Sequence, residues 1–286
     1  LEVNGTQLRV RGAGEAIIFA HQAGDANYDP ASEVNATVVV HTAPLEVIAH
    51  DAFKAYLEPI PELTFHYDGF AYDENATNVD QIEFAPPQVF TTATSQSPAG
   101  EYDVNATDGY AANYHFVYHN AHLFVGATGQ QITEFEVDSN ATYGDGSLQL
   151  FSSTTSGLPV EYHSSNPDVL EVNGAELLIR GAGQATIFAH QAGDANYDPA
   201  PEVNATVVVH TTELQVIAHD ASKEYLAPIP PLSFHYDGFA YDENATNLDP
   251  AEFAAPQIFA DADDQSPAGT YDVNATDGYA ANYHFT

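Results

Sequence analysis

Three loops of the sequence carry several oxygen-bearing side chains close together, as a hard cation such as Ca²⁺ requires of its ligands. Their acidic members are Asp25 and Asp29 in the first loop, Asp68, Asp73 and Glu74 in the second, and Asp138 and Asp145 in the third. None of the loops has the spacing of an EF-hand or of a glycine-rich nonapeptide repeat. The sequence therefore requires no cofactor but indicates calcium as the candidate metal. The alternative is that these loops are solvated turns held by Asp and Asn side-chain hydrogen bonds.

Asn-x-Thr sequons form a second chemical pattern. They begin at Asn4, Asn35, Asn75, Asn105, Asn140, Asn204, Asn244 and Asn274, and every one after Asn4 reads Asn-Ala-Thr. Chance pairing of Asn with Thr would give far fewer. Strand alternation places Asn35 and Asn105 on outward faces, so the sequence predicts N-linked glycans on most of the sites. The alternative is that Asn and Thr simply suit edge and turn positions.

Zinc and nucleophilic chemistry have little support in the sequence. The chain has no cysteine and 13 histidines. His119 and His122 lie close together in sequence, but alternation places His50 and His66 singly on sheet faces, without the paired spacing of a zinc site. No Gly-x-Ser-x-Gly elbow is present to carry a Ser-His-Asp triad. We therefore expect the protein not to be an enzyme.

Aromatic side chains beside the acidic loops suggest an alternative, lectin-like function. The two sets are Tyr67, Phe70 and Tyr72, and later Tyr236, Phe239 and Tyr241. Such rings can stack on sugars, which would make the chain a carbohydrate-binding repeat. The opposing interpretation is that they pack in the core and in turns, since Tyr usually does both.

Two recurring features have structural interpretations. Gly12-Ala-Gly14, which recurs at Gly181-Ala-Gly183, lacks the following helix and the Lys of a phosphate-binding loop, so it predicts a β-turn. Lys54, which recurs as Lys223, has the residue type needed for an isopeptide crosslink to an Asn. Packing of its aliphatic stem over aromatic surface is the favoured interpretation.

An internal repeat sets the elements that must position these residues. From Leu170 onward each residue corresponds to the one 169 places earlier without a gap, and most of the pairs are identical. A repeat of this length is too long for one supersecondary unit and fits two small domains. We therefore expect a tandem array whose segments are residues 1–42, 43–126, 127–211 and 212–286.

Short runs with period-two alternation, separated by turn residues, predict strands along the whole chain. Tyr102, Val104 and Ala106, for example, are expected to face inward. A closing hairpin is predicted from 114–118 and 121–125. No segment has the 3.6-residue period of a helix longer than a turn, so the predicted fold class is all-β, with β-sandwich domains.

Residues 127–211 resemble the bacterial immunoglobulin-like domains of surface proteins. The motifs that carry this resemblance are Gly157-Leu-Pro-Val160, Ser164-Ser-Asn-Pro167 and Gly181-Ala-Gly183. By the repeat, residues 1–42 correspond to the C-terminal half of such a domain.

Residues 43–126 resemble the MBG domains that alternate with immunoglobulin-like domains in large adhesins. The matching motifs are Asp51-Ala-x-Lys-x-Tyr56, Pro61-x-Leu-Thr64, Tyr67-Asp-Gly-Phe70, Ser97-Pro-Ala-Gly100 before Tyr102, and Asn113-Tyr-x-Phe116. Residues 212–286 then correspond to an MBG-like domain without its last strands. The resemblance implies the shaft of an extracellular adhesin or surface filament that extends from the cell for attachment or cell–cell contact.

The composition agrees with this implication. Five basic residues against 41 acidic ones give a net charge of −36, which excludes nucleic acid as a partner. A hydrophobic fraction of 44% is ample for packed cores. No apolar run is long enough to span a membrane. We expect an extracellular or cell-surface location, with neighbouring repeats of the same polypeptide or identical chains in a fibre as partners.

The repeat also leads us to expect that these 286 residues are not the whole polypeptide. Leu1 corresponds to Leu170, partway through the immunoglobulin-like segment, and Thr286 corresponds to Val117, before the predicted closing hairpin. Isolated domains do not tolerate the sheet edges and apolar faces that such ends would leave. We therefore expect segments like 131–168 and 118–125 to precede and follow the chain.

Overall fold

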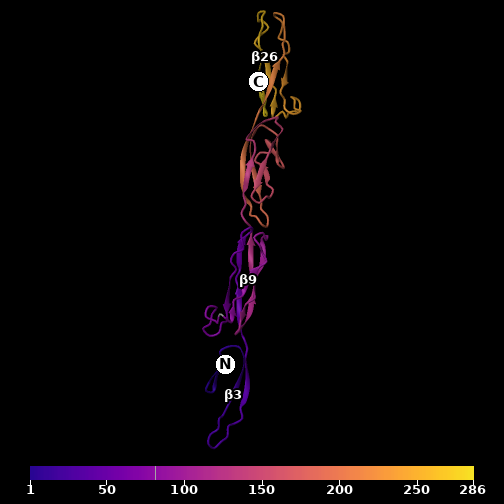
Figure 1. The fold of residues 1–286 in the computed structure, drawn as a ribbon. Helices are drawn as coiled ribbons and strands as arrows, with labels where there is room; N and C mark the ends of the chain where they lie inside the picture. Colours follow the sequence, from indigo (N-terminus) through magenta and orange to yellow (C-terminus); the bar gives the residue numbers. More distant parts are fainter. Residues whose placement is uncertain (81) are drawn as a thin grey trace. The chain divides into compact units, whose positions relative to one another are not determined.

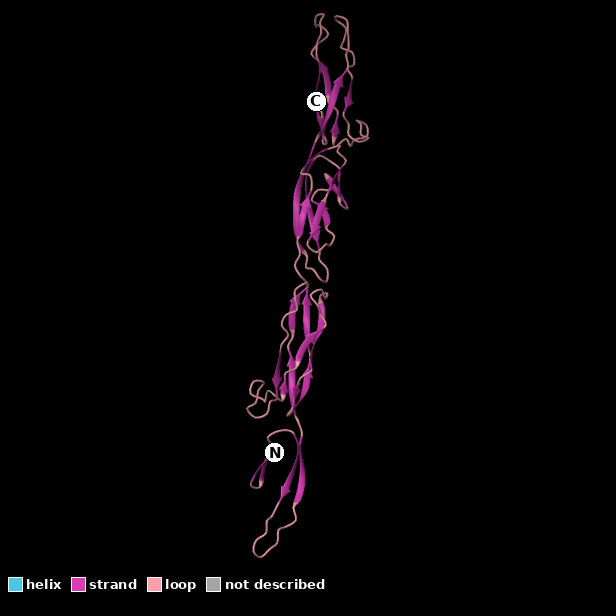
Figure 2. Ribbon diagram, viewed as in Figure 1, coloured by secondary structure: helices cyan, strands magenta, loops and turns pink. Residues whose placement is uncertain are grey.

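The computed structural model describes residues 1–80 and 82–286, and all the regular elements in these ranges are β-strands. Figure 2 accordingly shows the described residues as strands and loops alone. The all-β prediction is confirmed. The chain divides into two compact units, which are Leu1–Thr128 with Ala195–Tyr197 (unit 1) and Gly129–Asp194 with Asp198–Thr286 (unit 2).

Residues 1–42 of unit 1 form two antiparallel hairpins (Figure 1). Their strands are β1 (Glu2–Asn4), β2 (Gln7–Arg9), β3 (Gly14–Ala20) and β4 (Val34–Val40). Among the described residues no further strand joins either hairpin, and Leu8 and Val10 are 44% and 48% exposed. Their counterparts one repeat later, Leu177 and Ile179, lie in a packed core and are 0% and 4% exposed. The same apolar pattern is therefore covered in unit 2 and open in unit 1.

Residues 43–126 of unit 1 form two sheets and a short two-stranded ladder. Their strands are β5 (Ala43–Ala49), β6 (Ala52–Ala55), β7 (Phe65–Asp68), β8 (Phe84–Ala85), β9 (Gln88–Thr91), β10 (Gly100–Thr107), β11 (Tyr110–Ala111), β12 (Tyr114–His119) and β13 (Ala121–Gly126). One sheet has the order β12-β5-β7 and the other β6-β13-β10-β9, while β11 pairs with β8.

Alternation along these strands builds the core of unit 1. In β5, Leu45 and Val47 are 0% exposed, and in β10, Val104 is 0% and Ala106 is 7% exposed. Leu123 of β13 packs against Val104 in the same hydrophobic cluster. Burying a Leu or Val side chain stabilises a fold by roughly 1.5–3 kcal/mol. Burial of these residues therefore determines which face of each strand points inward. The inward positions predicted for β10 are confirmed.

The predicted closing hairpin of unit 1 is wrong. β12 pairs with β5 in parallel, whereas β13 pairs with β6 in parallel and with β10 antiparallel. The two strands therefore belong to different sheets, and the chain crosses between them at Asn120. Asn120 holds this crossing, because its Oδ1 accepts a hydrogen bond from Ala106 N at 3.2 Å.

Residues 129–194 and 198–211 of unit 2 form three sheets around one core. Their strands are β14 (Ile132–Glu136), β15 (Asn140–Thr142), β16 (Ser147–Gln149), β17 (Phe151–Thr154), β18 (Glu161–Ser164), β19 (Leu170–Asn173), β20 (Glu176–Ile179), β21 (Gly183–Gln191) and β22 (Ala200–His210). The sheets are β15-β22-β21-β18, β16-β20-β19 and β14-β17.

Residues 212–286 repeat the first strands and ladder of 43–126. Their strands are β23 (Thr212–Ala218), β24 (Phe234–Asp237), β25 (Phe253–Ala254), β26 (Gln257–Ala260), β27 (Val273–Thr276), β28 (Tyr279–Ala280) and β29 (Tyr283–Phe285). β24, β23 and β29 form one sheet, β25 pairs with β28, and β26 pairs with β27.

An open groove marks the difference between the two copies of this domain. In unit 1, β13 lies between β6 and the start of β10. In unit 2, residues 221–224, which correspond to β6, form no strand. Residues 220–225, together with 268–273 at the positions that correspond to the start of β10, line a groove of about 830 Å³.

The two segments of unit 2 share a single hydrophobic cluster. Leu214, Phe253 and Tyr283 from the second segment pack in it with Tyr143 and Leu170 from the first. This cluster joins residues 129–211 to residues 212–286 as one body. Among the described residues, no helix is long and apolar enough to cross a membrane.

Candidate functional site

Specific side-chain contacts join the two segments of unit 2, and we call this region the joint. Its centre is Glu243, whose carboxylate accepts hydrogen bonds from two tyrosines. Tyr143 OH donates to Glu243 Oε1 at 2.7 Å, and Tyr283 OH donates to Glu243 Oε2. Tyr143 comes from the first segment and Tyr283 from the second, and they are 5% and 4% exposed. One carboxylate therefore ties the two segments together.

The tyrosine rings at this joint also pack on one another. The ring of Tyr143 stands edge-on to Tyr241 and to Tyr283, with ring centres 5.4 and 5.6 Å apart. Such edge-to-face pairs contribute about 0.5–1.5 kcal/mol beyond their buried area. Burial, and then the hydrogen bond to the Glu243 carboxylate, raise the pKa of both Tyr143 and Tyr283. Both hydroxyls therefore remain protonated donors at neutral pH.

A backbone contact completes the joint. The Gly181-Ala-Gly183 turn meets Asn282, whose Oδ1 accepts a hydrogen bond from Ala182 N at 2.8 Å. A Cβ on Gly181 would lie 2.9 Å from the backbone oxygen of Asp168, so only glycine allows this approach. The turn predicted from the sequence is thus part of the joint.

The same docking recurs in unit 1. Ala13 N donates to Asn113 Oδ1 at 2.8 Å, the same distance as in the Ala182–Asn282 contact. Tyr114 OH donates to Glu74 Oε2 and accepts a hydrogen bond from Ala71 N at 2.9 Å. Sequence reasoning missed this joint, although the recurrence of Asn113-Tyr114 as Asn282-Tyr283 was a signal for it.

The carboxylates proposed for calcium lie in three separate parts of the chain, and several already accept hydrogen bonds. Asp25 Oδ1 accepts from Asn27 N at 2.7 Å and from Tyr28 N at 3.0 Å, while Asp145 Oδ2 accepts from Thr142 N at 2.7 Å. These contacts are those of side-chain-stabilised turns.

The remaining residues proposed for calcium are Glu74, Asp29, Asp68, Asp73 and Asp138. Glu74 bonds to Tyr114, and Asp29, Asp68, Asp73 and Asp138 are exposed. Within residues 1–80 and 82–286, no group of three or more His, Cys, Asp or Glu is placed to hold a metal ion. Calcium binding stays a prediction from the sequence.

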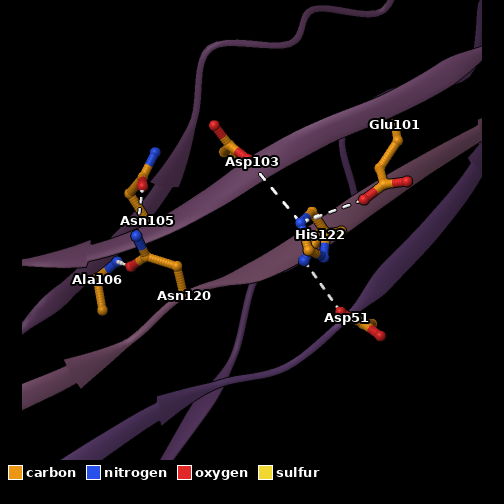
Figure 3. A network of polar contacts seen from close by, with 7 residues as sticks. All are labelled: Asp51, Glu101, Asp103, Asn105, Ala106, Asn120 and His122. Atoms are coloured by element: carbon orange, nitrogen blue, oxygen red, sulfur yellow. Dashed lines mark hydrogen bonds and ion pairs between the residues drawn. The ribbon is translucent and has the colours of Figure 1, made fainter.

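The sequon asparagines lie at the surface. Asn4, Asn35, Asn75, Asn140, Asn204 and Asn244 are exposed, and Asn105 and Asn274 are half-buried. Figure 3 shows Asn105 on β10, where its Oδ1 accepts a hydrogen bond from Asn120 Nδ2 at 2.8 Å. Asn105 lies between buried Val104 and Ala106, as the alternation predicts, whereas both neighbours of Asn35 are exposed.

Two sequons form hydrogen-bonded turns. Asn75 Oδ1 accepts from Thr77 N at 2.9 Å and from Thr77 Oγ1 at 2.6 Å. Asn244 repeats both contacts with Thr246, at 3.0 and 2.5 Å. At these two sequons the Asn and Thr side chains therefore stabilise a turn, which is the alternative that the sequence left open.

An acidic patch around His122 lies on the outer face of β10 and β13 beside the Asn105 sequon (Figure 3). His122 Nε2 is 3.2 Å from Glu101 Oε1 and 4.0 Å from Asp103 Oδ1. The backbone N–H of His122 donates to Asp51 Oδ1 at 2.9 Å. All these side chains are substantially exposed, so the ion pairs are worth at most about 1 kcal/mol each.

The aromatic residues proposed for sugar binding are divided between core and surface. Tyr67 and Phe70 pack in a cluster with Phe84, and the hydroxyl of Tyr67 is buried without a hydrogen-bond partner. Burial raises the pKa of Tyr67 to about 12. Tyr72 is 87% exposed, whereas its counterpart Tyr241 packs on the joint. No pair of neighbouring exposed rings is formed by either set.

The buried side chain of Lys54 donates hydrogen bonds to three backbone carbonyls of unit 1. Its side chain is 8% exposed, and Nζ donates to the carbonyls of Ala55, Glu58 and Ser95 at 3.0, 3.1 and 3.3 Å. Lys223 makes two of these three contacts in unit 2, to Ala227 and Asp264. The three carbonyls explain why an otherwise Lys-poor chain has a Lys here.

Comparison with protein families gives one match. The sequence model described as the MBG domain (YGX type) matches residues 45–124 and 214–286, together more than half of the chain. The matched ranges do not include residues 127–211, whose resemblance to bacterial immunoglobulin-like domains stays a prediction. No curated protein matches the sequence.

The chain is also similar to several solved structures. Drosophila N-cadherin EC1-4 is 11% identical over 90% of this chain and 72% of that chain, with a TM-score of 0.26. The S-layer protein rSbsC(31-844) is 11% identical over 96% of this chain and 45% of that chain, with a TM-score of 0.22. The C-terminal 282-residue fragment of intimin, solved with the Tir intimin-binding domain, is 15% identical over 46% of each chain, with a TM-score of 0.22. With TM-scores this low, these similarities carry no argument about function.

Proposed function

Because the chain belongs to the MBG domain family (YGX type), we propose that it is a repeat of the structural shaft of an extracellular adhesin or surface filament. In this role it is non-catalytic and holds attachment groups away from the cell. Its partners are neighbouring repeats of the same polypeptide or identical chains in a fibre.

The joint around Glu243 is the observation that supports this proposal most. A spacer must resist bending where its domains meet, and a flexible linker would not do so. Here the two segments of unit 2 share a hydrophobic cluster, and the Glu243 carboxylate accepts one hydrogen bond from each segment. The docking of Asn113 on Ala13 recurs as Asn282 on Ala182, so the same device is available at each repeat.

Spin-label distance measurements test the rigidity of the joint. The chain has no native cysteine, so the variant E161C/Q257C places a label on each segment of unit 2 at an exposed site. We expect a narrow distance distribution between the labels, and a clearly broader one when E243A is added. D73A, in unit 1, is the control and should leave the distribution narrow. A broad distribution in the parent variant would refute the shaft proposal.

The location is tested separately. An antibody raised against unit 2 should label intact source cells or shed filaments without permeabilisation. Labelling only after permeabilisation contradicts an extracellular shaft.

We further propose that the exposed sequons carry N-linked glycans in native material. Their support is the exposure of Asn4, Asn35, Asn140 and Asn204, which are not among the asparagines that hold turns. The intact mass of native protein should exceed that of the bare polypeptide. Treatment with an N-glycosidase should remove the excess, and an intact mass equal to that of the polypeptide contradicts the proposal.

A further inference from the structure

Two histidines of unit 1 meet edge to edge across neighbouring strands. His50 follows β5 and His66 lies in β7, and His50 Nε2 is 2.7 Å from His66 Nδ1. The ring centres are 4.9 Å apart and the planes differ by 23°. With the nitrogens this close and the rings nearly coplanar, the rings meet along the line between the nitrogens and do not overlap face to face.

The pair recurs in unit 2. His219 Nε2 is 2.9 Å from His235 Nδ1, with ring centres 5.0 Å apart and planes that differ by 26°. The two pairs are related by the 169-residue repeat. The arrangement is thus a property of the domain and is present twice in the chain.

Strand register brings the rings together. His66 is opposite Ile48 in the antiparallel β5–β7 ladder, and His50 N extends the ladder by donating to Thr64 O at 3.0 Å. His50 and His66 are therefore diagonal neighbours on the same face, within reach of long side chains. Alternation alone had placed them singly, because the sequence does not give the register of the partner strand.

A hydroxyl group orients the first ring of each pair. His50 Nδ1 is 2.9 Å from Thr64 Oγ1, and His219 Nδ1 is 3.0 Å from Ser233 Oγ. Thr and Ser differ, but both place a hydroxyl at this nitrogen. Metal-binding histidines are commonly held in this way, with a hydrogen bond on one nitrogen and the metal on the other.

The facing nitrogens can share a proton or hold a transition metal in its place. Separations of 2.7 and 2.9 Å are those of an N–H···N hydrogen bond, in which one nitrogen carries the proton and the other accepts. Neutral imidazole is a ligand for zinc, copper and nickel, whereas calcium takes oxygen ligands. Zinc–nitrogen bonds of about 2.0–2.1 Å in tetrahedral geometry need the nitrogens about 3.3 Å apart, with both lone pairs aimed at the metal. The nitrogens must therefore separate by roughly half an ångström, and the two exposed rings must turn away from their end-to-end arrangement.

We propose that the pairs His50–His66 and His219–His235 each bind one Zn²⁺ through two imidazole nitrogens. All four side chains are exposed, so water completes the coordination. The net charge of −36 raises the local cation concentration and favours entry. This inference does not depend on the proposed shaft function.

Zinc titration of the full 286-residue chain tests the proposal. Calorimetry at pH 7.5 and 0.15 M salt should show two sites of matched affinity, against none for Mg²⁺. H66Q should remove one site and H66Q/H235Q both, weakening zinc binding at least tenfold. H163Q is the matched control, because His163 stacks on Phe188 and not on another histidine. Two sites that persist in H66Q/H235Q, or no zinc binding by the parent chain, would overturn the proposal.

Histidine NMR signals give a readout that folding defects do not mimic. Zinc should shift the ring signals of His50, His66, His219 and His235 first. The shift should reverse when excess chelator removes the zinc. H50Q with an unchanged melting temperature provides a second variant if H66Q does not fold. A shift confined to His122, near Glu101 and Asp103, would place zinc elsewhere and refute the assignment.

Discussion

Tyr143→Phe isolates the hydrogen bond that Tyr143 gives to Glu243 across the joint of unit 2. The substitution keeps the ring and its contacts with Tyr241 and Tyr283 but removes the donor to a charged acceptor at 2.7 Å. A hydrogen bond to a charged group contributes about 1.5–3 kcal/mol. We therefore expect unit 2 to lose about 2 kcal/mol of stability while unit 1 is unchanged.

The chain divides into two compact units, and chains of several domains commonly depart from two-state unfolding, so the assay must resolve the units. Hydrogen exchange in increasing urea, read by peptide mass spectrometry, gives a separate midpoint for β10 in unit 1 and β22 in unit 2. With a urea dependence of about 2 kcal/mol per molar, the loss corresponds to a midpoint about 1 M lower for β22. Tyr72→Phe is the control, because Tyr72 is 87% exposed, and should shift neither midpoint.

A double-mutant cycle with Glu243→Gln then measures the coupling. If Tyr143 acts through Glu243, the two substitutions together should cost clearly less than the sum of the single losses. Fully additive losses, or an equal shift in both units, would show that the joint reasoning is wrong.

The remaining predictions concern unit 1 and the acidic loops. Lys54→Met should lower the urea midpoint of β10 by an amount that corresponds to about 1–3 kcal/mol, because three carbonyls lose their donor. Lys223→Met should destabilise unit 2 by less, because Lys223 binds two carbonyls. Equal losses of stability in the two variants would contradict this. Burial raises the pKa of Tyr67 from 10.0 to about 12, so the folded state favours the neutral phenol more than the unfolded chain does. The free energy of unfolding that results is fully present below pH 10 and is lost as the pH rises from about 10 to 12. Tyr67→Phe should reduce that alkaline loss, and should not destabilise unit 1 at pH 7, since the hydroxyl is unpaired; absorbance at 295 nm and melting curves between pH 8 and 12 check both outcomes. If the acidic loops bind calcium, excess chelator at constant ionic strength should lower the melting temperature. D25N is the comparison variant. A melting curve that the chelator leaves unchanged would reject calcium binding.

The sequence by itself determined the repeat, the fold class and the inward face of strands such as β10. The 169-residue correspondence and the alternation of Tyr102, Val104 and Ala106 are local patterns, and burial of one face follows from them directly. The MBG resemblance is confirmed for the same reason, since its motifs are contiguous in the chain.

Only the tertiary structure decided which strands and side chains meet. Alternation gives the face of a strand but not its partner, so β12 and β13 were predicted as a hairpin although they lie in different sheets. For the same reason His66 was placed alone, whereas the β5–β7 register sets it against His50. Glu243 and its counterpart Glu74 looked like loop carboxylates, and their tyrosine partners are 40 residues or more away in the chain. These contacts depend on the non-local pairing of strands, which no local pattern of residues specifies.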